Sequence, residues 1–306
     1  MLIDQLMRKV RRRLGCLDGP PVARGDTNAI AAGVAHLQAL APAADDADAP
    51  IFLMAAGWRS GSTLLQRCIM SDSRVLMWGE PYHECGLVQA LAESTRAFRA
   101  GWPKDKWFHR GVPPADLAAT WTANLFPAPD DWRLAQRALF DTAFAQPARR
   151  SGQPRWGIKE VRWTSDDARY LRWLYPRSRL VFLYRNPLDA YRSYRRRGGD
   201  WYDVFPERQV RTAEAFGRHW CRLAEGFLRD AEALGAMVLR FEDIVGGRDW
   251  VGAFERHLDI RLDPASLEVR LDGAEASAPW LEMDDAERRE LADATAPLAR
   301  KLGYTW

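Results

Sequence analysis

Residues 51–67 read IFLMAAGWRSGSTLLQR, and this stretch decides the fold. The apolar run at 51–55 predicts a short buried strand, and Gly57 and Gly61 bound the turn that follows it. Two hydroxyl residues then open a segment whose apolar positions have helical spacing. The stretch therefore predicts a strand, a glycine-bounded turn and a helix in direct succession.

This turn has the geometry that binds phosphate. Backbone N–H groups at a helix N-terminus lack intrahelical partners, the helix dipole favours an anion, and glycine allows close approach. Ser62 and Thr63 add hydroxyl donors, and Arg59 adds a guanidinium. The turn is not a Walker A motif, because no lysine follows Gly61, and the GxGxxG dinucleotide fingerprint is absent. The alternative is an ordinary strand-to-helix turn with hydroxyl caps.

Short apolar runs alternate with amphipathic helices along the rest of the chain. Further strands are predicted at 75–77, 156–158, 180–184 and 237–240. The segment 220–234 has apolar residues three and four apart and predicts a core-facing helix. A second helical run begins at Asp284, is interrupted at Pro297 and resumes to Leu302. The alternation predicts an α/β domain with a largely parallel sheet.

A second cluster of polar residues lies in residues 180–193, which read LVFLYRNPLDAYRS. Pro187 is typical of the first turn of a helix, so Arg185 is expected at the carboxyl end of a strand, where α/β proteins bind ligands. Ser193 follows about two turns later. Together Arg185 and Ser193 could hold a second phosphate. No strand ends in an aspartate suited to magnesium, which favours a metal-free anion site.

In this order, these motifs resemble the sulfotransferases that use 3′-phosphoadenosine-5′-phosphosulfate. The resemblance extends from Ile51 to about Tyr304. It includes the sequences WGIKE at 156–160, RFEDI at 240–244 and LARKLGY at 298–304. It implies a P-loop NTPase-like three-layer fold, in which helices flank a central, mainly parallel sheet.

The same resemblance implies roles for individual residues. The 5′-phosphosulfate would be held by the first loop, comprising Arg59, Ser60, Gly61, Ser62, Thr63 and Leu64. Arg185 and Ser193 would hold the 3′-phosphate, while Arg59 and Lys159 would neutralise the leaving oxygen. The donor is then 3′-phosphoadenosine-5′-phosphosulfate, the product is adenosine 3′,5′-bisphosphate, and no metal is needed.

Two departures indicate which sulfotransferases the chain is most similar to. The RKGxxGDWK-type segment of cytosolic aryl and steroid enzymes is absent, and Arg59 stands where their loop has lysine. The chain looks closer to carbohydrate and tyrosyl-protein sulfotransferases and their bacterial relatives, in which a glutamate after the second strand is commonly the base. That glutamate is Glu80, and His83 is the rival base. The structural alternatives are that Glu80 caps a helix or forms a salt bridge, and that Lys159 is an ion-pair partner near Glu160.

The expected acceptor is a hydroxyl on a carbohydrate or glycolipid, with a tyrosine or phenolic natural product as the alternative. Residues 84–153 resemble the helical insertion that shapes the acceptor cleft. Trp102, Trp107 and Trp280 are candidates to stack on a sugar ring. A nucleotide or sugar kinase ranks lower, because this chain lacks the phosphate-loop lysine and the magnesium-binding carboxylate that a kinase needs. A non-catalytic nucleotide-binding module also ranks lower, because such a module would not need Glu80.

Composition limits the partners. The net charge is only +3, so no nucleic-acid partner is expected. Residues 1–49 form a basic arm and an Ala/Pro/Asp-rich linker, and 50–306 form the sulfotransferase domain. The basic amphipathic stretch at 1–14 could touch an anionic membrane surface, or dock on protein. The four cysteines form no CxxC pair and no signal peptide is evident. We therefore expect reduced, mostly buried thiols and a cytoplasmic protein, peripheral at the inner membrane face if the arm binds lipid.

Overall fold

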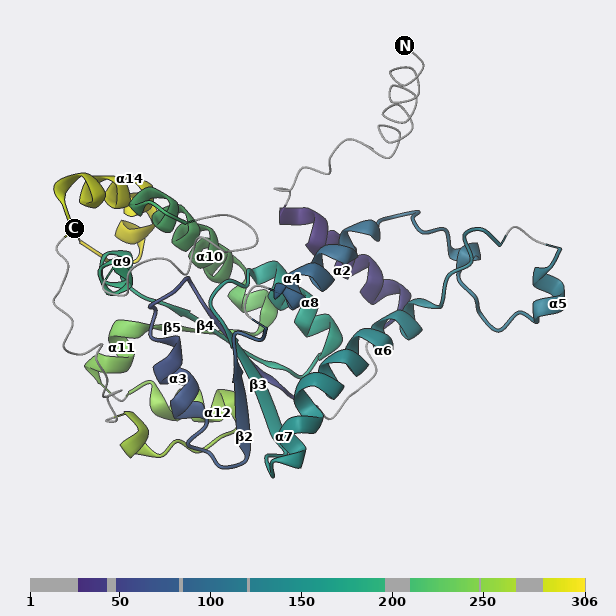
Figure 1. Ribbon diagram of the computed structural model, residues 1–306, viewed down its shortest axis with the longest axis horizontal. Helices are drawn as coiled ribbons and strands as arrows, with labels where there is room; N and C mark the ends of the chain where they lie inside the picture. The colour runs from purple at the N-terminus through teal and green to yellow at the C-terminus, as the bar shows by residue number, and fades with distance from the viewer. Residues whose placement is uncertain are drawn as a thin grey trace, which may run out of the picture.

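A five-stranded, all-parallel sheet lies at the centre of the computed structural model, which describes residues 27–42, 48–82, 85–119, 122–195, 210–247, 249–267 and 283–305 (Figure 1). The strand order is β2-β3-β1-β4-β5. The strands are β1 (Ile51–Ala55), β2 (Val75–Gly79), β3 (Arg155–Glu160), β4 (Arg179–Tyr184) and β5 (Met237–Arg240). Each covers a segment that the sequence predicts, so the α/β class with a parallel, P-loop-like sheet is confirmed. The stretch 1–14, Cys16, His83 and Trp280 lie outside the described residues.

The central strand is β1, which pairs with β3 on one side and β4 on the other. Ile51 is opposite both Gly157 and Arg179. Because all strands are parallel, their carboxyl ends share one edge of the sheet. The loop after β1 is therefore flanked by the ends of β3 and β4, which is where ligands bind in open α/β sheets.

Alternate residues of β1 face two separate cores. Phe52 and Met54 pack with α2 (Thr27–Leu40), α8 (Ser165–Leu174) and most of α10 (Ala213–Leu234). Ile51 and Leu53 pack with α3 (Ser62–Ile69), α9 (Pro187–Arg195) and α12 (Val251–Leu258). All five residues of β1 are buried, as expected for a parallel strand covered on both faces.

The C-terminal helix corrects one prediction. Helix α14 (Asp285–Lys301) runs through Pro297 without the interruption that the sequence indicates. Pro297 is exposed, so its ring and missing N–H lie on the solvent side. Leu291, Thr295 and Leu298 are buried on the opposite side, where α14 packs on α10. That packing offsets the cost of about 3 kcal/mol for an interior proline.

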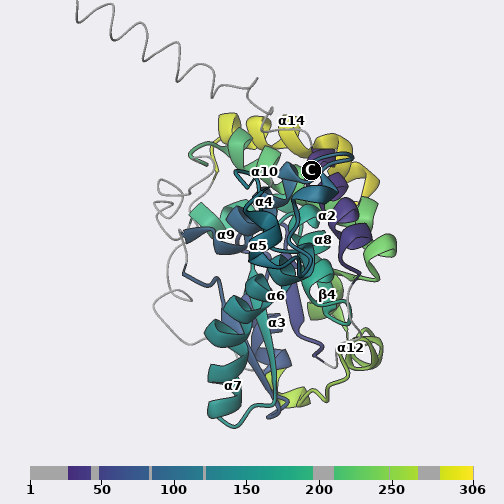
Figure 2. The ribbon, with the colours of Figure 1, turned by 90° about the vertical axis from the view of Figure 1, so that its right-hand side faces the viewer.

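The described parts of residues 85–150 are largely helical. They contain α4 (Leu87–Ser94), η2 (Thr95–Ala97), η3 (Asp105–Trp107), α5 (Pro114–Leu117), α6 (Pro129–Phe140), the π-helix η4 (Asp141–Ala145) and α7 (Gln146–Arg150). The segment between η2 and α6 projects from the body of the protein, with α5 near its tip (Figures 1 and 2). The chain also forms α11 (Phe241–Gly246) and η6 (Pro264–Leu267).

The described cysteines differ in how far they are buried. Cys68 is buried and Cys221 is partly buried, but Cys85 is exposed because it lies in the turn before α4, so the prediction of mostly buried thiols is only partly correct. None of the described helices combines the length and apolar character needed to span a membrane.

Candidate functional site

The loop after β1 is strongly curved. Gly57, Arg59 and Gly61 all have left-handed backbone, with φ of 81°, 57° and 89°. Gly61 is the N-cap of α3 and offers no side chain to its first turn. The hydroxyl of the fully buried Ser60 has no hydrogen-bond partner in the part of the chain that the structure describes. The loop thus presents uncapped helix N–H groups and a buried hydroxyl, which suits an anion.

Gly61 is required by close packing as well as by its backbone angle. A Cβ at this position would lie 2.1 Å from the ring of Phe241, the first residue of α11. The same ring packs against the Arg185 guanidinium at 4.5 Å. Phe241 therefore connects the first loop to the arginine at the end of β4.

The second motif joins the first through Arg59. The Arg59 Nε donates to the Ser193 hydroxyl at 3.0 Å, and Arg185 Nη1 donates to the Arg59 carbonyl at 3.0 Å. Trp220 Nε1 donates to the Arg185 carbonyl and so orients the end of β4. The structure therefore brings Arg59, Arg185 and Ser193 together, although 134 residues separate the first from the last.

Arg185 lies in a partly desolvated position. Burial lowers its pKa, Asp189 and Glu242 oppose this, and the positive charge of Arg59 adds to it. The Arg185 Nε is buried without a hydrogen-bond partner among the described residues. A buried guanidinium with an unused N–H favours an incoming anion, because burying an unsatisfied donor costs free energy.

Glu242 fixes the turn that carries Arg185. Its carboxylate accepts from the Asn186 N–H at 2.9 Å, the Tyr304 hydroxyl at 2.9 Å and Arg240 Nε at 3.2 Å. Burial is the largest cause that raises the pKa of Tyr304, which keeps that hydroxyl protonated as a donor. Glu242 and Tyr304 lie in the sequences RFEDI and LARKLGY, for which the resemblance implies no role.

Glu80 and Lys159 form an ion pair across neighbouring strands. Lys159 Nζ donates to Glu80 Oε1 at 2.5 Å, and the Glu80 N–H donates to the Lys159 carbonyl at 2.8 Å. The side chain of Lys159 is 6% exposed and that of Glu80 is 25% exposed. Lys159 is therefore not the partner of Glu160, which instead pairs with Arg162 at 2.7 Å. The accessible end of the pair is the carboxylate.

Tyr82, two residues after Glu80, packs on a second aromatic ring. Tyr82 has a left-handed backbone with φ of 58° and is 63% exposed. Its ring lies 6.0 Å from that of Phe144, which is carried by the π-helix η4. Trp78 Nε1 donates to the Phe144 carbonyl and anchors this helix to β2. Glu80 also has a positive φ, of 23°, and strained non-glycine residues of this kind are concentrated at functional sites.

A buried histidine that sequence reasoning missed supports the first loop. The His219 ring lies 4.8 Å from the Trp58 ring and packs under Gly57. Burial lowers the pKa of His219 well below its ordinary value, with help from Arg222 and Arg162, so the ring is neutral at pH 7. Its signal in the sequence is only a polar residue on the core side of the helix that contains Trp220.

The remaining candidate residues differ in burial and in position. Ser62 is buried, Leu64 is partly buried and Thr63 is exposed at the start of α3. Trp102 and Trp107 pack together at 4.8 Å on the projecting segment. The described residues contain no group of His, Cys, Asp or Glu side chains arranged to hold a metal ion.

Comparison with known proteins identifies the family. A sequence model described as the sulfotransferase family matches residues 50–263. Similar solved structures include the sulfotransferase domain of the Synechococcus PCC 7002 olefin synthase, at 17% identity and a TM-score of 0.45, with 86% of this chain and 98% of that chain covered. They also include sulfotransferase STF9 from Mycobacterium avium, at 14% identity and a TM-score of 0.38, covering 85% and 78%. No curated protein matches. This match covers more than half of the chain, and the chain therefore belongs to the sulfotransferase family.

Proposed function

We propose that this sulfotransferase transfers a sulfuryl group from 3′-phosphoadenosine-5′-phosphosulfate to a hydroxyl group on a carbohydrate or glycolipid. The observation that carries the proposal is the double link through Arg59, whose side chain reaches Ser193 and whose carbonyl accepts from Arg185. A donor with phosphate groups at both its 5′ and 3′ positions needs two anion sites held at a fixed separation. The link between the first loop and the second motif, which contains Arg185 and Ser193, supplies that rigidity.

The chemistry of the two loops fits such a donor. The first loop offers the uncapped N-terminus of α3 and the unpartnered Ser60 hydroxyl, both suited to the 5′-phosphosulfate. The second motif offers the unpartnered Nε of Arg185 and the hydroxyl of Ser193 in α9, suited to the 3′-phosphate. Neither loop requires a metal ion to balance the charge, since both are cationic.

In the proposed reaction the acceptor hydroxyl oxygen forms a bond to sulfur on the side opposite the leaving group. The bond from sulfur to the 5′-phosphate oxygen breaks, and that oxygen keeps the electron pair. Glu80 takes the hydroxyl proton, while Arg59 and Lys159 neutralise the leaving oxygen. The pairing of Lys159 with Glu80 supports these roles, because it holds the base and one cation at the same edge of the sheet.

The acceptor is proposed to rest on the exposed Tyr82 ring, two residues after Glu80. The exposed Tyr82 ring, backed by Phe144, offers a flat face for a sugar ring. The same face suits a phenolic ring, so sulfation of a tyrosine or phenolic natural product is the second candidate. We propose that residues 84–153 shape this cleft, and that His83, beside Tyr82 in sequence, is the rival base.

The test combines substrate screening with one variant. Radiolabelled donor is offered with glycan, peptide and phenolic acceptors in the presence of EDTA. Glu80→Gln should lower kcat about 10²- to 10⁴-fold while donor affinity stays nearly unchanged. Glu214→Gln, at an exposed ion pair on α10, is the control and should retain activity.

Two outcomes would change the proposal. If His83→Ala abolishes transfer and Glu80→Gln does not, the base is wrong while the reaction stands. If adenosine 3′,5′-bisphosphate gives no thermal shift in EDTA but ATP with magnesium does, the proposed donor is wrong and the kinase alternative replaces the proposal.

A further inference from the structure

The segment between η2 and α6 reaches away from the rest of the protein. Both views of the ribbon show it extending from the body, with α5 near its end (Figures 1 and 2). None of the described helices or strands of the body packs extensively against η3 or α5. The segment is therefore placed to meet a surface that the body does not touch.

The projecting segment is closed at a narrow neck. The His109 N–H donates to the Phe126 carbonyl at 2.7 Å, and the Phe126 N–H donates to the Trp107 carbonyl at 2.8 Å. The Trp107 ring also lies 4.8 Å from that of Trp102 and 6.3 Å from that of Phe126. The neck thus has a small aromatic core of its own, which holds the loop 111–125 away from the body. We call this loop the tip.

The tip is nearly uncharged, and many of its apolar residues are exposed. Asp116 is its only charged residue. Val112 is 42% exposed and Leu125 is 39% exposed. The exposed apolar residues also include Pro113, Pro114, Ala115, Ala118, Ala119 and Ala123. Apolar side chains gathered on one exposed surface mark a site of contact with a protein or a membrane.

Positive charge gathers at the neck, next to the tip. Residues 99–110 contain one acidic side chain, Asp105, and four exposed basic ones, namely Arg99, Lys104, Lys106 and Arg110. Arg110 pairs with Asp105 at 2.7 Å, but both side chains are more than half exposed, so the pair is weakly held. Lys104 Nζ lies 5.4 Å from the centre of the Trp107 ring, a cation–π contact. Four basic groups against one acidic group leave +3 on the neck.

This concentration of charge is local. The whole chain also carries only +3, so the rest of the sequence is balanced and the neck is a basic collar around an apolar tip. Tryptophan prefers the level of the lipid head groups, and lysine and arginine bind anionic lipids there. Protein interfaces instead depend on large anchoring side chains and are depleted of alanine. The alanine- and proline-rich tip and its basic collar therefore fit a negatively charged membrane surface better than a protein.

We propose that the tip inserts into the head-group region of an anionic lipid bilayer. Val112 and Leu125 enter the boundary between head groups and acyl chains, and the lysines and tryptophans of the neck stay at the level of the lipid phosphates. The contact is peripheral and non-covalent. It is separate from the basic stretch at 1–14, and it does not depend on the proposed reaction.

The experiment is co-sedimentation of the full chain with two kinds of vesicle, phosphatidylcholine alone and phosphatidylcholine mixed with phosphatidylglycerol. The protein should bind the mixed vesicles more tightly, and added salt should weaken that binding. Val112→Asp combined with Leu125→Asp should weaken it about tenfold or more, because two buried apolar groups are lost. Lys106→Glu should weaken it about tenfold, since it reverses one charge near the lipid surface.

Two control variants make the same changes on the body. Val245→Asp alters an apolar side chain that is 60% exposed in α11, on the side of the molecule opposite α5 (Figure 1). Arg218→Glu reverses a charge that is 73% exposed on α10. Both should leave vesicle binding unchanged. Because all the replaced side chains are exposed, thermal unfolding should be the same for every variant.

The proposal is overturned if the mixed vesicles do not bind the protein. It is also overturned if the tip and neck variants bind as the natural protein does, which would assign the binding to another segment such as 1–14, or if the controls lose as much binding as they do. If the protein ignores vesicles but self-associates, and Val112→Asp abolishes that association, the tip docks on protein and the membrane proposal fails.

Discussion

Replacing Gly61 by alanine tests whether the first loop depends on close packing or only on backbone conformation. Two costs are expected. A left-handed backbone costs an alanine about 1 to 2 kcal/mol, and φ at Gly61 is 89°. The new Cβ would also lie 2.1 Å from the Phe241 ring, and such overpacking costs about 1 to 3 kcal/mol. The free energy of unfolding should fall by about 2 to 5 kcal/mol.

The protein contains a matched control for the first cost. Gly152 has the same φ of 89°, but a Cβ there would meet no atom within 4 Å. Gly152→Ala should therefore cost only about 1 to 2 kcal/mol. The difference between the two variants isolates the contact with Phe241. In a Phe241→Ala background that contact is gone, so adding Gly61→Ala should cost no more than Gly152→Ala does in the natural protein.

The assays are urea unfolding followed by circular dichroism, and calorimetry with adenosine 3′,5′-bisphosphate. Because the Phe241 ring also packs on Arg185, displacing it should weaken binding of the bisphosphate, while Gly152→Ala should not. The reasoning is refuted if Gly61→Ala and Gly152→Ala lower the free energy of unfolding equally. It is also refuted if Gly61→Ala costs as much in the Phe241→Ala background as in the natural protein.

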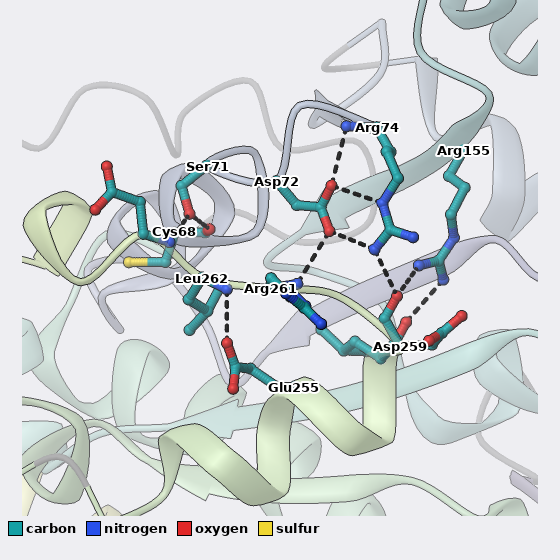
Figure 3. Close-up of polar contacts among 11 residues, drawn as sticks. Cys68, Ser71, Asp72, Arg74, Arg155, Glu255, Asp259, Arg261 and Leu262 are labelled. Carbon is teal, nitrogen blue, oxygen red and sulfur yellow. Dashed lines mark hydrogen bonds and ion pairs between the residues drawn. The ribbon is translucent and has the colours of Figure 1, made fainter.

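Three further predictions follow from individual contacts. Arg185→Ala should weaken the binding of adenosine 3′,5′-bisphosphate by about 1.5 to 3 kcal/mol and that of adenosine 5′-monophosphate much less. Equal losses of binding free energy in calorimetry would show that Arg185 does not contact the 3′-phosphate. Hydrogen bonds from the Arg74 side chain, at 2.6 and 3.0 Å, are the main cause that lowers the pKa of Asp72 (Figure 3). The stability from this carboxylate is therefore present above about pH 4 and is lost as pH falls further. Asp72→Asn should cost about 2 to 3 kcal/mol at neutral pH and flatten that loss in urea unfolding curves, whereas an unchanged acid limb would contradict the assignment. Tyr82→Ala should raise KM for the acceptor with little change in donor affinity, and Tyr82→Phe should restore it if stacking is the cause.

The sequence was sufficient to predict the sheet because its strands are short apolar runs separated by helices of clear period. It was also sufficient to place Arg59 and Arg185 at strand ends, since a parallel sheet collects those ends at one edge. It could not predict that Phe241 packs on Gly61, because that contact depends on how α11 leaves β5. It also could not pair Lys159 with Glu80 rather than Glu160, because the choice depends on the register of β2 against β3. The predicted interruption at Pro297 was wrong for a related reason. It was inferred from the proline alone, whereas packing of α14 on α10 determines that the helix continues.

The central position of β1 has a consequence for how the protein is made. Residues 51–55 are synthesised before both strands that pair with them, which lie more than a hundred residues further along the chain. During translation this wholly apolar segment emerges with no partner, and contacts of such long range form slowly. The nascent chain is therefore exposed to aggregation until β4 has left the ribosome, and a fragment that ends before residue 155 would carry the loop after β1 without either of the strands that pair with β1.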